Sequence, residues 1–222
     1  MTKKFKVLIT SGPTREYLDP VRFLSNASSG KMGTAIAAAL IKVGIEPVIV
    51  SGPVAIKYPD GVDVHFVETT QEMLEQSITL FDQCIGLIGV AAPCDFTPKI
   101  FAKQKIAKPK NKNNGISIDL KQTADILAEI GKRKRNDQWI VGFALETDNN
   151  SNNKKKKAMA KLKQKNCDYI VLNTPDSINN NITTLEIFDK KGNSINKLNG
   201  TKNNIAIKLV KSVIPIRIFT GK

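Results

Sequence analysis

The segment Ser11–Gly33 carries the residue types that bind phosphate. Its sequence, SGPTREYLDPVRFLSNASSGKMG, follows an apolar β-branched run at residues 5–10 and precedes an alanine-rich run at residues 34–41. These two runs are typical of a strand and a helix. Free backbone N–H groups and the positive end of a helix dipole favour an anion at such a junction. Gly30 and Gly33 would let the backbone approach a phosphate closely. The sequence therefore predicts a phosphate-bearing ligand at the end of the first strand.

The glycine spacing of this loop fits neither common phosphate-binding motif. Residues 29–33 read SGKMG, which is not GxGxxG, and the segment lacks the GxxxxGK[ST] order of a Walker A loop. An NAD(P)-dependent Rossmann-type oxidoreductase, one alternative, is also disfavoured because Val50-Ser51-Gly52 stands where an acidic residue would end the second strand. The sequence does not decide whether Lys31 binds phosphate or is merely exposed.

Segments typical of strands and helices alternate along the chain. The expected strands are 5–10, 47–50, 62–67, 84–90, 116–120, 139–144 and 169–172, and the expected helices are 31–43, 70–80, 123–132, one that ends near 165, and 201–213. A capping box at Thr69 and Glu72 marks the start of the second helix. This alternation predicts an α/β fold with a Rossmann-like, mostly parallel sheet and helices on both faces. Ligands of such sheets lie outside the carboxyl ends of the strands.

Two segments depart from the alternation. Residues 97–115 are basic and have few apolar side chains, so we expect a flap or a long excursion over the site. Residues 184–189 and 194–196 flank the turn sequence KKGN and predict a C-terminal β-hairpin. The length of 222 residues suits one core, and we expect residues 1–222 to form a single domain.

The charge balance raises the alternative of a nucleic-acid-binding module. The chain has 34 Lys and Arg against 20 Asp and Glu, a net charge of +14. However, the lysines are spread along the chain, aromatic residues make up only 6%, and no RRM, KH or zinc-finger pattern occurs. We therefore favour solvated lysines together with a pocket for phosphorylated ligands, and expect no nucleic-acid partner.

Other sequence features limit the location and the chemistry. No apolar run reaches the ~18 residues of a membrane span, and no signal peptide precedes the first strand, so we expect a cytoplasmic protein without membrane contact. The three cysteines lack metal-ligand spacing. The single histidine, His65, excludes a histidine metal cluster and disfavours a Ser-His-Asp triad.

Five segments occur together in an order that resembles a known enzyme family. They are the loop at 11–33, AAPCDF at 91–96, KIAK at 105–108, VGFALET at 141–147 and KxxxKxxDYIVLN at 161–173. The set closely resembles the phosphopantothenoylcysteine synthetases, the second enzyme domain of the flavoprotein family of coenzyme A biosynthesis. The resemblance implies a two-step ligase. A substrate carboxylate attacks the α-phosphate of a nucleotide, and the amine of cysteine then displaces the nucleotide to form an amide.

The resemblance also implies roles for individual residues. Asn26 would act in the cysteine-dependent step, and Lys105 would stabilise charge during formation of the acyl-nucleotide. Arg22 would reach the phosphopantothenate of the neighbouring subunit. The implied substrate-binding residues are Arg22, Asn26, Ala91, Ala92 and Asp95. The implied nucleotide-binding residues are Gly12, Ser28, Gly30, Gly33, Gly89, Val90, Ala91, Asp95, Lys105, Thr123, Ala124, Asp125, Ile126, Phe143, Lys161, Lys165 and Asn173. Metal ligands are not assigned.

The same resemblance implies the co-substrates and partners. Residues 123–126, 161 and 165 resemble the CTP-using bacterial branch, with an ATP-using ligase as the alternative. We expect Mg²⁺, 4′-phosphopantothenate and L-cysteine, an acyl-cytidylate intermediate, and pyrophosphate and CMP as by-products, with no flavin. We expect a homodimer whose site is completed across the interface. Because the chain begins at the first strand of the synthetase, we expect a stand-alone enzyme of the bacterial type and a separate decarboxylase that acts next in the pathway.

Overall fold

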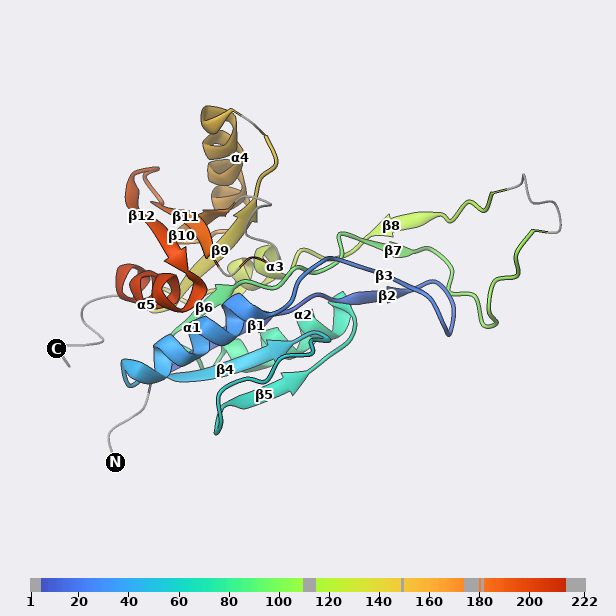
Figure 1. Ribbon diagram of the computed structural model, residues 1–222, viewed down its shortest axis with the longest axis horizontal. Coiled ribbons are helices and arrows are strands. Elements are labelled where there is room, and N and C mark those ends of the chain that lie inside the picture. The colour runs from blue at the N-terminus through green and yellow to red at the C-terminus, as the bar shows by residue number, and fades with distance from the viewer. Residues whose placement is uncertain (1–4, 110–114, 149, 174–179, 181, 215–222) are drawn as a thin grey trace.

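A mostly parallel sheet forms the centre of the molecule. The computed structural model describes residues 5–109, 115–148, 150–173, 180 and 182–214. Eight strands lie in the order β12-β11-β10-β9-β6-β1-β4-β5 (Figure 1). Their bounds are β1 (Lys6–Ser11), β4 (Glu46–Ser51), β5 (Asp63–Phe66), β6 (Gly86–Gly89), β9 (Trp139–Leu145), β10 (Tyr169–Asn173), β11 (Ile182–Asp189) and β12 (Ser194–Thr201).

The strand order reverses at the centre of the sheet. Strands β10, β9, β6, β1, β4 and β5 pair in parallel, and the chain runs outward from β1 to β5 before it returns to β6 on the other side of β1. Ligands of doubly wound sheets bind at the carboxyl ends of the strands where the order reverses, here β1 and β6. Strands β11 and β12 add the predicted antiparallel hairpin at one edge. The Rossmann-like prediction is confirmed.

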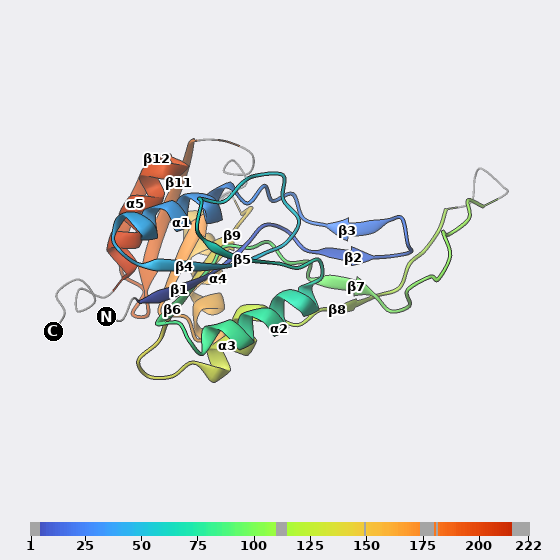
Figure 2. The same cartoon turned by 90° about the horizontal axis from the view of Figure 1, so that it is seen from below.

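Helices cover both faces of the sheet, as predicted. Helices α1 (Lys31–Lys42) and α5 (Lys202–Val213) lie on one face, and α2 (Thr70–Phe81), α3 (Ile126–Arg133) and α4 (Ser151–Gln164) on the other (Figures 1 and 2). Successive side chains of a strand point to opposite faces. In β1, Val7 and Ile9 accordingly belong to one apolar cluster with residues of α1 and α5, while Leu8 belongs to a second cluster with residues of the other three helices. Each face therefore has its own apolar core.

The helix starts follow from capping groups. Thr69 accepts a hydrogen bond from the Glu72 N–H and the Glu72 side chain accepts one from the Thr69 N–H, so the predicted capping box is confirmed. Helix α3 begins three residues later than predicted because the Asp125 side chain accepts from the Ala128 N–H. Thr123 and Ala124 therefore lie in a loop rather than in a helix. No helix in the described part of the chain is long and apolar enough to cross a bilayer.

Two hairpins project together from the sheet. The first arm, residues 15–25, contains β2 (Arg15–Tyr17) and β3 (Phe23–Ser25). The second arm, residues 96–109 and 115–122, contains β7 (Phe96–Pro98) and β8 (Leu120–Gln122). Both extend away from the helices, side by side (Figures 1 and 2). The sequence did not predict β2 and β3, and its expected strand at 116–120 is wrong. The alternation of Ile116 and Ile118 resembles a strand, but pairing with residues 96–98 selects residues 120–122 instead.

Candidate active site

Two adjoining clefts lie at the carboxyl ends of β1, β6, β9 and β10. The first cleft encloses about 460 Å³ and the second about 350 Å³. Ala91, Asp95 and Phe143 line both clefts, so the two form one continuous surface. This surface lies where the reversal of the strand order predicts a ligand site.

The clefts gather most of the site residues expected from the sequence. Of those twenty residues, seventeen line one or both clefts. The first cleft contains Asn26, Ser28, Gly30, Gly33, Val90, Ala91, Ala92, Asp95, Phe143, Lys161 and Asn173. The second contains Gly89, Ala91, Asp95, Thr123, Ala124, Asp125, Ile126, Phe143 and Lys165. Segments from five separate regions of the chain thus meet at one edge of the sheet.

The glycine-rich loop brings the start of α1 against the end of β1. Gly30 caps the helix with a φ of +73°, in the left-handed region that favours glycine. At Gly33 a Cβ atom would lie 2.1 Å from Ser11 Oγ, so only glycine fits that close approach. The Tyr58 hydroxyl donates to the same Ser11 Oγ at 2.9 Å and fixes it. The first turn of α1 consequently lines the first cleft through Lys31, Met32 and Gly33, and the start of a helix favours an anion.

Asn26 connects the glycine-rich loop to the loop after β6. Its Nδ2 donates to the Pro93 carbonyl at 2.8 Å and to the Ala92 carbonyl at 3.3 Å. Two hydrogen bonds at Cys94 also fix the loop after β6. The Cys94 N–H donates to Thr14 Oγ1 at 2.8 Å, and Thr123 Oγ1 donates to the Cys94 carbonyl at 2.6 Å. The two loops that line the first cleft therefore form one hydrogen-bonded unit.

Acidic side chains position the two lysines near the C-terminal end of α4. Lys161 Nζ lies 2.7 Å from Glu146 Oε1, and Glu146 is only 6% exposed. Lys165 Nζ lies 3.0 Å from Asp125 Oδ2. Lys161 lines the first cleft and Lys165 the second, so each cleft has one ammonium group from this helix end.

Gly12 is one of three expected site residues that line neither of the two clefts. A Cβ atom at Gly12 would be 2.7 Å from Val54 Cγ1. Its φ is +74°, and its carbonyl accepts from the Ala92 N–H at 2.9 Å. Gly12 thus supports the loop after β6 through a backbone hydrogen bond.

Arg22 and Lys105 are the other two expected site residues that line neither cleft, and both lie on the arms. Arg22 Nη2 is 2.7 Å from Asp19 Oδ2 and donates to the Ile106 carbonyl at 2.6 Å, beside Lys105. Within the described part of residues 97–121, no residue lines either cleft. The arm that contains this segment extends away from the central sheet at β7 and β8 (Figure 1). The segment is thus the expected long excursion, but Asp19 ties it to the first arm rather than over the chain's own clefts.

Asp19 joins the two arms through a buried carboxylate. Its side chain has no exposed surface and accepts from the N–H groups of Val21, Arg22 and Ile106 at 2.8, 2.9 and 3.1 Å. Desolvation raises the pKa of this carboxyl, but these hydrogen bonds and the Arg22 guanidinium outweigh it and hold the pKa well below its usual range. The carboxylate therefore stays charged and keeps the arms together.

Lys202 is a cleft residue that sequence reasoning missed. It is the first residue of α5 and lines the first cleft together with Lys31. Burial and the nearby charge of Lys31 lower the pKa of Lys202. Helix α5 packs against α1, and only this packing brings two residues so far apart in the sequence to the same cleft.

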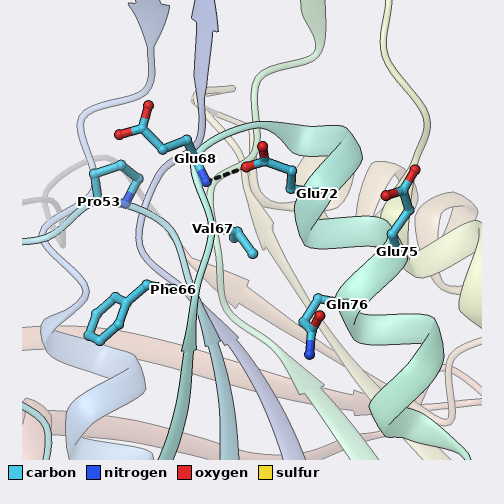
Figure 3. Close-up of a pocket in the computed structure, with 7 residues that line it drawn as sticks. All are labelled: Pro53, Phe66, Val67, Glu68, Glu72, Glu75 and Gln76. Atoms are coloured by element: carbon cyan, nitrogen blue, oxygen red, sulfur yellow. Dashed lines mark hydrogen bonds between the residues drawn. The ribbon is translucent and has the colours of Figure 1, made fainter.

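A separate acidic hollow lies between the end of β5 and α2. It is lined by Pro53, Phe66, Val67, Glu68, Glu72, Glu75 and Gln76 (Figure 3). Glu72 accepts from the Glu68 N–H at 2.7 Å, and its carboxylate belongs to the capping box. With three carboxylates and no lysine or arginine among its described lining residues, this hollow would repel a phosphate.

Comparison with known proteins places the chain in a family. Residues 2–216 match the family model described as DNA/pantothenate metabolism flavoprotein C-terminal domain. The chain belongs to this family. The resemblance inferred from the five sequence segments is thereby confirmed.

Individual relatives agree with this assignment. The chain is 36% identical over 210 residues to the coenzyme A biosynthesis bifunctional protein CoaBC of Borreliella burgdorferi, covering 94% of this chain and 52% of that protein. It is 39% identical over 218 residues to a protein of an unknown prokaryotic organism named cysteine/cysteine sulfinic acid decarboxylase, covering 95% and 58%. The chain thus spans little more than half the length of these relatives.

A solved structure has the same fold. The crystal structure of the C-terminal domain of CoaBC is 35% identical in sequence and superimposes with a TM-score of 0.76, covering 94% of this chain and 93% of that one.

Proposed function

We propose that this protein is a ligase that joins 4′-phosphopantothenate to L-cysteine in coenzyme A biosynthesis. The observation that carries the proposal is the meeting of the glycine-rich loop, the loop after β6 and the lysines of α4 at two adjoining clefts. The membership of the family, which includes a domain of CoaBC, supports the same reaction. Two clefts suit a reaction that brings together a nucleotide and a second phosphorylated substrate.

The proposed reaction has two balanced steps. The carboxylate of 4′-phosphopantothenate attacks the α-phosphorus of a nucleoside triphosphate, and the bond to pyrophosphate breaks. The amine of cysteine then attacks the acyl carbon, loses a proton and displaces the nucleoside monophosphate. Both steps build negative charge on phosphate or acyl oxygens. Fixed N–H donors from the glycine-rich loop and the lysine ammonium groups would stabilise that charge.

We assign Asn26 to the cysteine-dependent step. Its Nδ2 lies at the joint between the two loops of the first cleft, 2.8 Å from the Pro93 carbonyl. An amide supplies an uncharged donor and acceptor where the acyl-nucleotide would lie. Ala91, Ala92 and Asp95, on the loop after β6, would contact the pantothenate group.

We further propose CTP as the nucleotide and the second cleft as the base-binding part of the site. Residues 123–126 line that cleft, and the Asp125 side chain is already engaged with the Ala128 N–H and Lys165. Base recognition would then fall to neighbouring backbone groups, which suit the small edge of a pyrimidine. An ATP-using ligase is the alternative.

Mg²⁺ fits this site only together with the nucleotide. The described residues contain no cluster of three or more His, Cys, Asp or Glu side chains that could hold a metal. Asp95 lines both clefts and is the carboxylate that could contact such an ion, whereas Glu146 is paired with Lys161. Mg²⁺ commonly binds through one or two carboxylates and substrate phosphates. It would neutralise phosphate charge.

We propose that two copies of the chain form a homodimer through the arms. Val21, Ile100 and Phe101 are 57%, 83% and 52% exposed there. Arg22 and Lys105 lie on the same arms, away from the chain's own clefts. Both residues would act on the clefts of the second copy, with the Arg22 guanidinium as a planar donor for the substrate phosphate.

The direct test is pyrophosphate release with 4′-phosphopantothenate and Mg²⁺. CTP and ATP are compared, each with and without cysteine, and the organic product is identified by mass spectrometry. Pyrophosphate release with CTP and a cysteine-dependent amide product is the expected result. The same product with ATP preferred would overturn the assignment of the base site. No turnover with either nucleotide, in a folded protein, would overturn the ligase.

Two variants test the division of labour between the steps. Asn26→Asp should keep pyrophosphate release but lose amide formation, whereas Lys105→Gln should impair the first step. Lys121→Gln, an exposed residue of the same arm, serves as the matched control and should behave as the unmodified protein. Normal turnover by either of the first two variants would refute that assignment.

Mixing inactive variants tests the shared site. Arg22→Gln and Asn26→Asp each disable every site in a homodimer. After the two are mixed and exchanged, a heterodimer has one site with both original residues, so activity should partly return. If mixing restores nothing although heterodimers form, Arg22 does not act across the interface.

A further inference from the structure

A hollow beside the first cleft gathers three lysines. It encloses about 540 Å³ and is lined by Lys31, Lys57 and Lys202, together with the polar residues Thr34, Thr201 and Asn203. These residues come from three separate parts of the fold: the start of α1, the segment after β4, and the start of α5. No carboxylate is among the hollow's described lining residues.

The lysine hollow is continuous with the first cleft. Lys31 and Lys202 line both, so they form the rim between the two. A ligand whose one end lies against the glycine-rich loop can therefore extend past this rim into the hollow. The start of α1, where the helix dipole favours an anion, lines both the cleft and the hollow.

The charges around Lys202 favour an anion. Burial and the Lys31 charge both lower the pKa of Lys202, because two ammonium groups near each other raise the cost of charging either one. No described carboxylate lies within ion-pair distance of Lys202 or Lys57 to offset this cost, whereas Lys161 and Lys165 at the same clefts each have an acidic partner. A polyanion in the hollow would supply negative charge beside Lys57 and Lys202.

We propose that the lysine hollow binds the terminal phosphates of the nucleotide whose remaining part occupies the clefts. The ligand class is a polyphosphate anion, and Lys202 is the residue that distinguishes a triphosphate from a monophosphate. This inference rests on the proposed function only in that the clefts take a nucleoside triphosphate. The same lysines would hold free pyrophosphate after it has left the nucleotide.

Calorimetric titration of the intact protein tests the inference. The probes are CTP, ATP, CMP, AMP and inorganic pyrophosphate, each with Mg²⁺. Lys202→Met should weaken binding of the better triphosphate and of pyrophosphate by about 10-fold, since one charge-assisted contact is lost, and leave the monophosphates unchanged. Lys57→Met, in a segment outside the helices, should act in the same direction. Lys208→Met, an exposed residue of the same helix α5, is the matched control and should change nothing.

The possible outcomes separate this inference from the proposed function. If Lys202→Met and Lys57→Met both bind the triphosphates as tightly as the unmodified protein, the lysine hollow does not receive the phosphates. Equal weakening of mono- and triphosphates would place Lys202 at the nucleoside and also overturn the inference. If the protein binds polyphosphates through these lysines but makes no amide product, the inference stands and the ligase proposal fails.

Discussion

Replacing Gly33 by alanine tests how closely α1 is packed against the end of β1. An added Cβ atom would lie 2.1 Å from Ser11 Oγ and 2.7 Å from Ser11 Cβ. Ordinary van der Waals contact begins at 3.4 Å, so both distances are too short. Ser11 is not free to turn, since the Tyr58 hydroxyl donates to its Oγ at 2.9 Å and also lies 2.8 Å from Ser51 Oγ. Helix α1 must therefore move outward, which widens the space between its first turn and the end of β1.

The expected cost follows from two opposing effects. Overpacking a well-packed site costs roughly 1–3 kcal/mol, and the severe overlap at Gly33 places this variant near the upper end. Alanine is intrinsically better than glycine in a helix by about 1 kcal/mol. We therefore expect Gly33→Ala to lower the free energy of unfolding by about 2 kcal/mol.

Urea unfolding followed by circular dichroism measures this loss, with Ser11 variants as the internal test. Ser11→Gly removes both clashing atoms, whereas Ser11→Ala removes Oγ and leaves the Cβ at 2.7 Å. The penalty of Gly33→Ala should therefore shrink most in the Ser11→Gly background and less in Ser11→Ala. Gly115→Ala is the control, because nothing lies within 4 Å of that Cβ position. An unchanged penalty in all three Ser11 backgrounds would refute this account of the packing.

Three further predictions concern other parts of the molecule. Burial raises the pKa of Cys84 to about 11 and of Cys167 to about 12, so at pH 8 both thiols should resist alkylation until the protein unfolds; rapid modification of the native protein would contradict this. Asp19→Asn should lower the melting temperature at pH 7 and release the Ile106 N–H to hydrogen exchange. The native pKa of Asp19 is depressed, so its carboxylate stabilises the fold above the unfolded pKa of about 3.9. This stabilisation is lost as the pH falls through the native pKa. The difference in melting temperature between the variant and the unmodified protein should therefore narrow only in acid. Thr69→Ala removes the capping box of α2 and should cost about 1 kcal/mol by urea unfolding, while unchanged stability would show that the cap is dispensable.

The sequence by itself determined the architecture of the sheet and the composition of the clefts. Apolar periodicity and capping groups are local signals, and they located the parallel strands, the five helices and the capping box at Thr69. The chemistry-bearing loops follow strands, and parallel strands end at the same edge of a sheet. Seventeen of the twenty expected site residues consequently meet at the two clefts, although their roles stay predictions.

Only the tertiary structure decided the course of the arms and the position of Lys202. The arms depend on contacts such as the one between Arg22 and the Ile106 carbonyl, which are 84 residues apart. A basic segment such as 97–115 has few apolar side chains, so no periodicity indicates where it packs. Lys202 reaches the rim beside Lys31 only because α5 packs against α1. Such contacts depend on which surfaces meet in space, and local sequence patterns carry no information about that.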